Sequence, residues 1–217
     1  IKYIEEVDKI RVEGIKEDEA IYNNFMFTLE HAKSLGIEVT EESIDSTLLK
    51  SLEPVYKAIT CAEATSNNSN LTGIPFGNRK EGRTPDEVMI NTRTEGFCEL
   101  IRRRFVIGLF ILQKENQEKL FKNAQRVRRM IVDKITDLFK EYDGYIVPAF
   151  DRIAPHFDET FDTLSDRYLL YSEHLAIANF GGFPSITIPS GLVDGMPFAV
   201  NITTNIMKDD VMFNIAK

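Results

Sequence analysis

The stretch Thr92-Arg-Thr-Glu-Gly-Phe-Cys-Glu-Leu-Ile-Arg-Arg-Arg-Phe-Val-Ile-Gly108 is the most informative part of this sequence. It places three consecutive arginines, residues 102–104, directly before an apolar segment at residues 105–112. A guanidinium stays charged in a protein, so one that is turned toward the apolar side needs an anion. Three successive helical positions spread over about 200°, which favours one arginine facing away from bulk water. The sequence therefore predicts either an anion-binding site or a solvated basic face paired with Glu95 and Glu99.

The overall composition is typical of a soluble globular protein, with 43% hydrophobic and 28% charged residues among 217. The net charge of −8 and the pI near 5.0 disfavour a chain that grips a nucleic-acid backbone by itself. Cys61 and Cys98 lie far apart without a neighbouring histidine, which predicts reduced thiols and a cytoplasmic location. No apolar run approaches the length needed to cross a bilayer.

The two ends of the sequence both predict regular structure. Residues 1–4 are typical of a strand, and residues 213–217 are typical of a helix interior. Natural chains seldom begin and end inside secondary structure, so we expect a fragment of a longer protein. Within it, residues 1–48 are expected to form a strand, a helix and a strand, and residues 49–217 a helical layer with terminal strands.

Periodicity and turn residues predict a mixed α/β chain. Ile21, Phe25 and Leu29 recur at the spacing of one helical face, and Gly36 is suited to end that helix. The segment at residues 84–87, Thr-Pro-Asp-Glu, is a strong helix start with a capping Thr and a capping-box Glu. The predicted helices cover residues 17–35, 47–64 (interrupted or started at Pro54), 84–142 (with breaks near Gly96 and before Lys114) and 164–180. The predicted strands cover residues 37–40, 145–148, 185–188 and 197–202, the last two as a hairpin, and a loop covers residues 66–82.

Five segments, in order, resemble one protein family. They are Cys-Ala-Glu-Ala-Thr-Ser-Asn at residues 61–67, the stretch at 92–108, Lys-Asn-Ala-Gln-Arg-Val-Arg at 122–128, Tyr-Asp-Gly-Tyr-Ile-Val-Pro at 142–148 and Ala-Asn-Phe-Gly-Gly-Phe-Pro-Ser-Ile-Thr-Ile-Pro-Ser-Gly at 178–191. Together they resemble the amidase signature family, and within it the C-terminal half of the A subunits of glutamyl-tRNA(Gln)/aspartyl-tRNA(Asn) amidotransferases. The resemblance implies the C-terminal part of the amidase signature fold, a mixed sheet flanked by helices, incomplete in this chain.

The resemblance also implies a glutaminase whose catalytic residues are not in this chain. Members of the family use a Lys and two Ser, one of them in a Gly/Ser-rich loop, to form an acyl-enzyme with an amide. No segment resembles the Gly-Gly-Ser-Ser-Gly-Gly signature, so we expect that this chain alone hydrolyses no amide. The whole glutaminase would release ammonia from glutamine. In a complex with subunits B and C, a partner subunit would use that ammonia, with ATP and Mg, to convert Glu-tRNA(Gln) or Asp-tRNA(Asn) to Gln-tRNA(Gln) or Asn-tRNA(Asn).

The resemblance assigns two poles to a glutamine pocket. Arg104 matches the arginine that binds the α-carboxylate, a contact suited to a forked guanidinium. Tyr56 matches a tyrosine of the pocket, although without the resemblance it would be interpreted as a half-buried core residue. At the position of the aspartate that receives the α-amino group this sequence has Ser172, with Glu173 beside it. A hydroxyl holds an ammonium less firmly than a carboxylate, so either Ser172 or Glu173 could serve.

The other candidate sites are weaker. His156, Asp158 and Asp162 have metal-binding chemistry but no tight ligand spacing, and a solvated acidic loop is the alternative. His174 fits a pocket residue or a satisfied helix residue, and the second is expected. No Gly-rich phosphate loop is present, so we expect no cofactor on this chain and assign ATP to another subunit.

Two other functions fit the same residues. One is a fragment of a tRNA-independent amidase that acts on a small or fatty amide, which the departure at Ser172 leaves open. The other is a non-catalytic helical interaction module in which residues 114–142 dock a partner. In either case a truncated domain is expected to expose apolar surface that a second copy or a partner subunit would cover.

Overall fold

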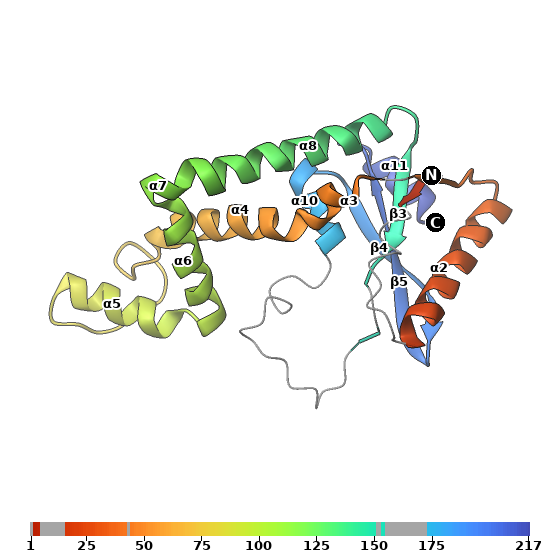
Figure 1. Cartoon of the computed structure of the whole chain (residues 1–217). Helices are drawn as coiled ribbons and strands as arrows, with labels where there is room; N and C mark the ends of the chain where they lie inside the picture. The colour runs from red at the N-terminus through yellow and green to blue at the C-terminus, as the bar shows by residue number, and fades with distance from the viewer. Residues whose placement is uncertain (1, 5–15, 43, 151–152, 155–172) are drawn as a thin grey trace. The chain divides into compact units, whose positions relative to one another are not determined.

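The computed structural model describes residues 2–4, 16–42, 44–150, 153–154 and 173–217 (Figure 1). The chain forms two compact units. We call Ile1–Glu53 with Arg128–Lys217 the sheet unit, and Pro54–Val127 the helical unit. The chain passes from one unit to the other within helices α4 (Leu52–Asn67) and α8 (Asn123–Leu138).

The sheet unit is built on a mixed sheet with helices, which confirms the predicted fold class. Among the described residues the strand order is β2-β1-β3-β5-β4, in which β1 is parallel to β2 and β3, and β5 is antiparallel to β3 and β4. The strands are β1 (Lys2–Ile4), β2 (Thr40–Glu42), β3 (Gly144–Pro148), β4 (Ser185–Val193) and β5 (Met196–Thr204). The helices and helical turns of this unit, besides most of α8, are α2 (Lys16–Ser34), α3 (Ser46–Lys50), η3 (Glu173–Leu175), α10 (Ala176–Gly181) and α11 (Asp209–Ile215).

Several element ends differ from the prediction: the helix predicted at residues 47–64 is divided at Ser51 and continues to Asn67, and the helical stretch predicted up to residue 142 ends at Leu138. The strand predicted at residues 37–40 begins only at Thr40, because the amide of Ile37 donates to the carbonyl of Ala32 across the left-handed Gly36, at φ 86°. This bond belongs to the helix cap and commits Ile37 to the end of α2. At the other end of the chain, the helix predicted around residues 213–217 is α11, which ends at Ile215. Of the helix predicted at residues 164–180, residues 164–172 lie outside the described part.

The predicted hairpin is confirmed and is longer than expected. Strands β4 and β5 remain paired up to a tight turn at Asp194 and Gly195, whose φ angles are 49° and 78°. Positive φ at both central positions is the requirement of a type I′ turn, which matches the twist of paired strands. The turn fixes Val193 opposite Met196. Farther from the turn, β4 has a bulge between Pro189 and Gly191.

The two faces of the sheet are packed differently. On one face, Phe25 and Leu29 of α2 pack against Ile146, Val200 and Ile202, all of them at most 4% exposed. The predicted apolar stripe of α2 therefore faces the sheet. Alternation along the strands places the neighbouring residues on the opposite face.

On the opposite face, Tyr145 is buried and its phenol is hydrogen-bonded with Thr203. The ring of Phe139 stacks on Tyr145 with 6.0 Å between the centroids. Asn201 joins the same layer, since its Oδ1 accepts hydrogen bonds from Ser185 and Thr203. Burial disfavours the phenolate and raises the pKa of Tyr145 well above its ordinary value.

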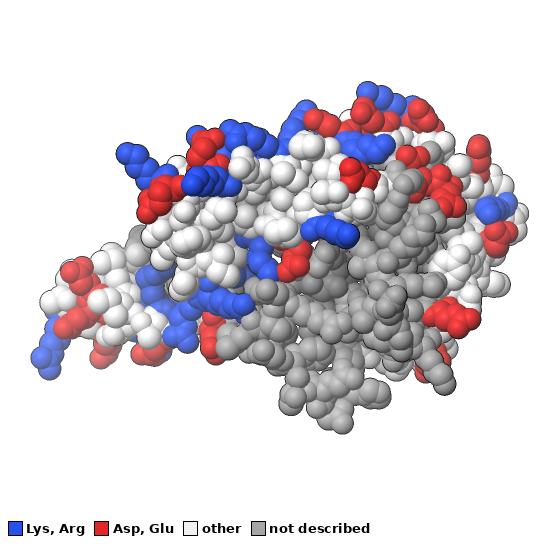
Figure 2. Space-filling view, in the orientation of Figure 1, with Lys and Arg blue, Asp and Glu red and all other residues white. Residues whose placement is uncertain are grey.

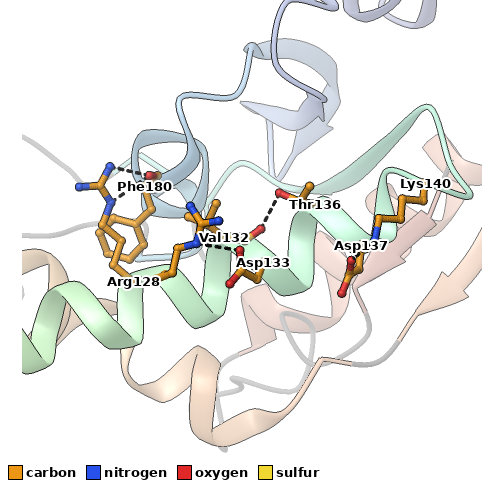
Figure 3. Close-up of polar contacts among 8 residues, drawn as sticks. Arg128, Val132, Asp133, Thr136, Asp137, Lys140 and Phe180 are labelled. Carbon is orange, nitrogen blue, oxygen red and sulfur yellow. Dashed lines mark hydrogen bonds and ion pairs between the residues drawn. The ribbon is translucent and has the colours of Figure 1, made fainter.

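Arg128 at the start of the sheet-unit part of α8 holds the C-terminal end of α10 (Figure 3). Its Nε and Nη2 atoms both donate to the carbonyl of Phe180, at 2.9 and 2.8 Å. Helix carbonyls at this end lack partners within the helix, so the guanidinium satisfies one of them. Gly182 then turns the backbone at φ 66° into the segment before β4, as predicted.

The helical unit contains the rest of α4 and the elements η1 (Asn68–Asn70), α5 (Pro85–Gly96), α6 (Glu99–Leu112), α7 (Lys114–Gln117) and η2 (Glu118–Lys122). The predicted helix breaks are confirmed, because α5 ends at Gly96 and α6 ends before Gln113. Thr84 caps α5 by accepting the amide of Glu87 at 3.2 Å. In the described part of the chain, no helix has the length and apolar character of a membrane span.

Candidate functional site

Helices α4 and α6 are in close contact at Gly108, inside the helical unit. A Cβ built on Gly108 would overlap the carbonyl of Cys61 and the hydroxyl of Thr65. The Thr65 hydroxyl donates to the carbonyl of Cys61 at 2.8 Å and lies 3.4 Å from that of Phe105. The absence of a side chain at Gly108 therefore lets the two helices meet at backbone distance.

The three consecutive arginines of α6 lie in different environments. Arg102 is exposed, whereas Arg103 and Arg104 are half-buried and Nη1 of Arg103 is inaccessible to solvent. Arg104 precedes Gly108 by four residues, so it lies one turn earlier on nearly the same side of α6. Arg104 is thus on the side of α6 that packs against α4.

Electrostatics places Arg104 close to the buried part of this helix crossing. Burial raises the pKa of the Cys61 thiol, while the positive charges of Arg104, Lys57 and Arg103 act in the opposite direction. Cys61 is 2% exposed and remains a protonated thiol at neutral pH, which makes it a packing residue and not a nucleophile. The contact between α4 and α6 is therefore apolar, and the positive charges of Arg104, Lys57 and Arg103 act on it from nearby.

The acidic residue Glu95 does not explain the charge of the three arginines. Its carboxylate pairs with Lys80 at 2.7 Å. The predicted alternative was a solvated basic face paired with Glu95 and Glu99; Glu95 pairs with Lys80, and the pairing with Glu99 stays a prediction. A half-buried guanidinium in such a position is suited to an external anion.

Arg93, in the arginine-rich stretch at residues 92–108, holds the loop that precedes α5. Nη1 of Arg93 donates to the carbonyls of Asn68 and Leu71 at 2.7 and 3.1 Å. The same guanidinium lies over the rings of Phe97 and Phe105, at 5.1 and 5.5 Å from their centroids. Sequence reasoning missed this role, although an arginine before two aromatic residues is a signal for stacking.

The sequence-predicted Tyr56 also lies in the helical unit, on α4. It is half-buried, and its carbonyl accepts the hydroxyl of Thr60 at 2.8 Å. Tyr56 precedes Cys61 by five residues, which rotates it by about 140° from Cys61 around the helix axis. Tyr56 and Arg104 therefore share a unit, and Tyr56 leaves α4 on a different side from Cys61.

The other predicted pole lies in the sheet unit or outside the described residues. Ser172 is outside them, and of Glu173 the structure describes only the backbone, which opens the short helical turn η3. Next to it, Nε2 of His174 is hydrogen-bonded to the carbonyl of Pro148 at 2.7 Å, which confirms a satisfied helical residue.

The metal-binding candidates His156, Asp158 and Asp162 also lie outside the described residues. Within the residues that are described, no group of three or more His, Cys, Asp or Glu side chains could hold a metal ion.

The two units differ in charge. The helical unit carries 12 Lys and Arg against 8 Asp and Glu, a formal charge of +4. The sheet unit carries 14 against 26, a formal charge of −12, and the two values add to the −8 of the chain. Figure 2 shows basic side chains gathered around α6. The candidate site therefore lies in the basic part of an acidic chain.

Known proteins match nearly all of this chain. The amidase family model matches residues 10–212. The A subunit of glutamyl-tRNA(Gln) amidotransferase from Clostridium botulinum strain Langeland is 33% identical over 164 residues, 74% of this chain and 33% of that protein. The corresponding protein of strain Eklund 17B is 31% identical over 204 residues, 93% of this chain and 40% of that protein. The chain thus spans between a third and two fifths of the length of these relatives.

Solved structures agree with the sequence matches. The A subunit of glutamyl-tRNA(Gln) amidotransferase from Thermotoga maritima is similar with a TM-score of 0.66 at 26% identity, over 99% of this chain and 40% of that one. A crystal structure described as an amidase has a TM-score of 0.73 at 17% identity, over 100% of this chain and 44% of that one. The second likeness concerns the fold alone. Both likenesses indicate that this chain corresponds to part of a larger α/β fold.

Proposed function

The chain belongs to the amidase family, and from that premise we propose that it is part of the glutamine-hydrolysing component of a tRNA-dependent amidotransferase. The observation that carries the proposal is the half-buried Arg104 on the packed side of α6. Its guanidinium has the charge and the fork to receive the α-carboxylate of glutamine. The similarity to two amidotransferase proteins at 31% and 33% identity supports glutamine as the amide.

In this proposal the chain contributes binding and not bond cleavage. Arg104 would fix one end of glutamine so that its side-chain amide is presented to a nucleophile. Because no Gly/Ser-rich signature is present in this sequence, the Lys and Ser residues that attack the amide would come from the rest of the complete protein. Ammonia would then pass to subunits B and C, where ATP, Mg and the mischarged tRNA are used.

The α-amino group of glutamine is assigned to Ser172 or Glu173 by the sequence. The two candidates are separated by parallel substitutions, Ser172→Ala and Glu173→Gln, in the complete protein. Loss of the side chain that accepts from the α-ammonium should raise KM for glutamine about tenfold, since hydrogen bonds to charged groups contribute roughly 1.5–3 kcal/mol. The substitution that raises KM identifies the partner.

The proposal is tested by glutaminase kinetics of the complete protein with Arg104→Ala. We expect KM for glutamine to rise about 10- to 100-fold with kcat little changed, because the lost contact binds substrate and transition state alike. Arg102→Ala is the matched control, since the neighbouring side chain is exposed, and it should leave KM unchanged. Unaltered kinetics in Arg104→Ala, or preference for an uncharged amide over glutamine, would contradict the proposal and favour a tRNA-independent amidase.

A further inference from the structure

Arg93 of α5 joins the turn that follows α4 to the first part of α6. Its Nη1 atom donates to the carbonyls of Asn68 and Leu71, at 2.7 and 3.1 Å, and η1 with these residues directly follows α4. Its guanidinium also lies over two rings, that of Phe97 just before α6 and that of Phe105 within α6, at 5.1 and 5.5 Å from the centroids. One half-buried side chain thus contacts both helical segments.

Phe105 is held through its ring and through its backbone. The ring packs edge-to-face on that of Phe97, with 4.9 Å between the centroids and an angle of 88°, and Arg93 lies over both rings. The carbonyl of Phe105 accepts the hydroxyl of Thr65 on α4 at 3.4 Å. Arg104 is the preceding residue of the same turn. The backbone that carries Arg104 is therefore fixed by contacts that lie next to it.

The contacts of Arg93 require an arginine. A guanidinium is planar, so it donates hydrogen bonds in its plane while its face lies on aromatic rings. An ammonium has the same charge but no flat face, so a lysine cannot replace both contacts. Because the Nη1 atom of Arg93 is already bound to two carbonyls, this residue holds the structure and does not contact a substrate.

We propose that Arg93 is a positioning residue, which fixes Phe105 and its turn of α6 so that Arg104 presents its guanidinium to the substrate carboxylate. The inference rests on the proposed function, because it concerns how the same arginine is held. A forked contact needs two parallel hydrogen bonds at once. A displacement of about 1 Å is enough to weaken such a contact severely. Loss of Arg93 should therefore weaken the binding of glutamine, although Arg93 does not touch it.

The first test is glutaminase kinetics of the complete protein with Arg93→Met. KM for glutamine should rise about tenfold with kcat little changed, because the displaced contact binds substrate and transition state alike. KM does not depend on the amount of folded enzyme. Arg93→Lys should behave like Arg93→Met, since it keeps the charge but not the stacking. Arg126→Met is the matched control, because Arg126 is exposed and pairs with Glu118 at 2.7 Å, and it should leave KM unchanged.

The second test combines Arg93→Met with Arg104→Ala. If Arg93 acts through Arg104, its loss should change KM less than about twofold once Arg104 is gone. A purely structural role would instead raise KM by the same factor in both backgrounds, and that result would overturn the inference. An unchanged KM in Arg93→Met, or full recovery of KM in Arg93→Lys, would overturn it as well. If Arg104→Ala alone raises KM in those cases, the proposed function stands. If Arg104→Ala alone leaves KM unchanged, the proposed function and this inference both fail.

Discussion

The sheet unit and the helical unit use different means to hold their helices in place. In the sheet unit, α2 is held by large apolar side chains, with Phe25 and Leu29 at 0% and 1% exposure against the strands. In the helical unit, α6 is held against α4 where a side chain is missing, at Gly108. Burial of large residues leaves no room for charge, whereas the backbone contact at Gly108 has the half-buried Arg104 one helical turn away.

This difference explains why the candidate site lies in the helical unit. Strand residues that face inward in the sheet unit are apolar or form a closed hydrogen-bonded layer, such as Tyr145 with Thr203. The helical unit instead carries the positive formal charge of +4 within a chain of −8. The sheet unit is thus held by large buried side chains and the helical unit by a backbone contact, and three substitutions test that difference.

The largest expected effect is in the core of the sheet unit. Phe25→Ala should lower the free energy of unfolding by about 3 to 5 kcal/mol, because it removes a fully buried ring and leaves a cavity. Phe27→Ala on the same helix is the control, since Phe27 is 71% exposed, and it should change stability by less than about 0.5 kcal/mol. Urea unfolding measures both. Similar losses for the two variants would mean that α2 does not pack on the sheet through Phe25.

A smaller loss is expected at the helix crossing. Gly108→Ala should destabilise the helical unit by about 1 to 3 kcal/mol, because its Cβ meets the Cys61 backbone, which cannot move as a side chain would. It should also weaken glutamine binding by displacing Arg104. Gly96→Ala is the control, since an added Cβ there meets nothing within 4 Å.

Gly96→Ala should leave the stability of the helical unit unchanged or raise it slightly, whereas Gly108→Ala should lower it. Hydrogen exchange of the α4 and α6 amides reports the change locally. Faster exchange in both variants, or in neither, would argue against a close contact at Gly108.

The smallest effect concerns alkaline pH and separates the two faces of the sheet. Because burial raises the pKa of Tyr145, the folded state keeps this proton more tightly than the unfolded state does. The resulting stability is complete below the ordinary tyrosine pKa of 10.0 and is lost as pH rises above it. One such group contributes a slope of about 1.4 kcal/mol per pH unit.

Tyr145→Phe should remove that slope, which is read from unfolding free energies at pH 9 to 11. Cys61, whose pKa is also raised from 9.0, acts in the same direction, and comparison with Tyr22→Phe at the same pH cancels its contribution. Tyr22 is 37% exposed and provides the control. Equal slopes in the two variants would show that the Tyr145 phenol is not buried.

The sequence predicted the elements whose signals are local. The stripe of Phe25 and Leu29, the cap at Thr84 and the turn after Gly182 each depend on residues a few positions apart, and each is found as expected. Strand β2 was misplaced because Ile37 has a strand-like neighbourhood in sequence while its amide bonds back into the helix cap.

The candidate site was only partly predictable for the same reason. Three adjacent arginines and an apolar run fit either an anion site or a solvated basic face, and the sequence alone does not say which arginine is half-buried. That depends on which side of α6 meets α4, and it is decided by Gly108 against Cys61, 47 positions apart. The use of Arg93 to hold the loop carbonyls is likewise a consequence of tertiary packing.

The most direct test of the central claim is a crystal structure of the complete protein with glutamine bound. We predict that both carboxylate oxygens lie within about 2.7 to 3.2 Å of the Arg104 guanidinium nitrogens, the range of direct hydrogen bonds. A glutamine whose carboxylate is held by other residues, with Arg104 turned into solvent, would contradict the account.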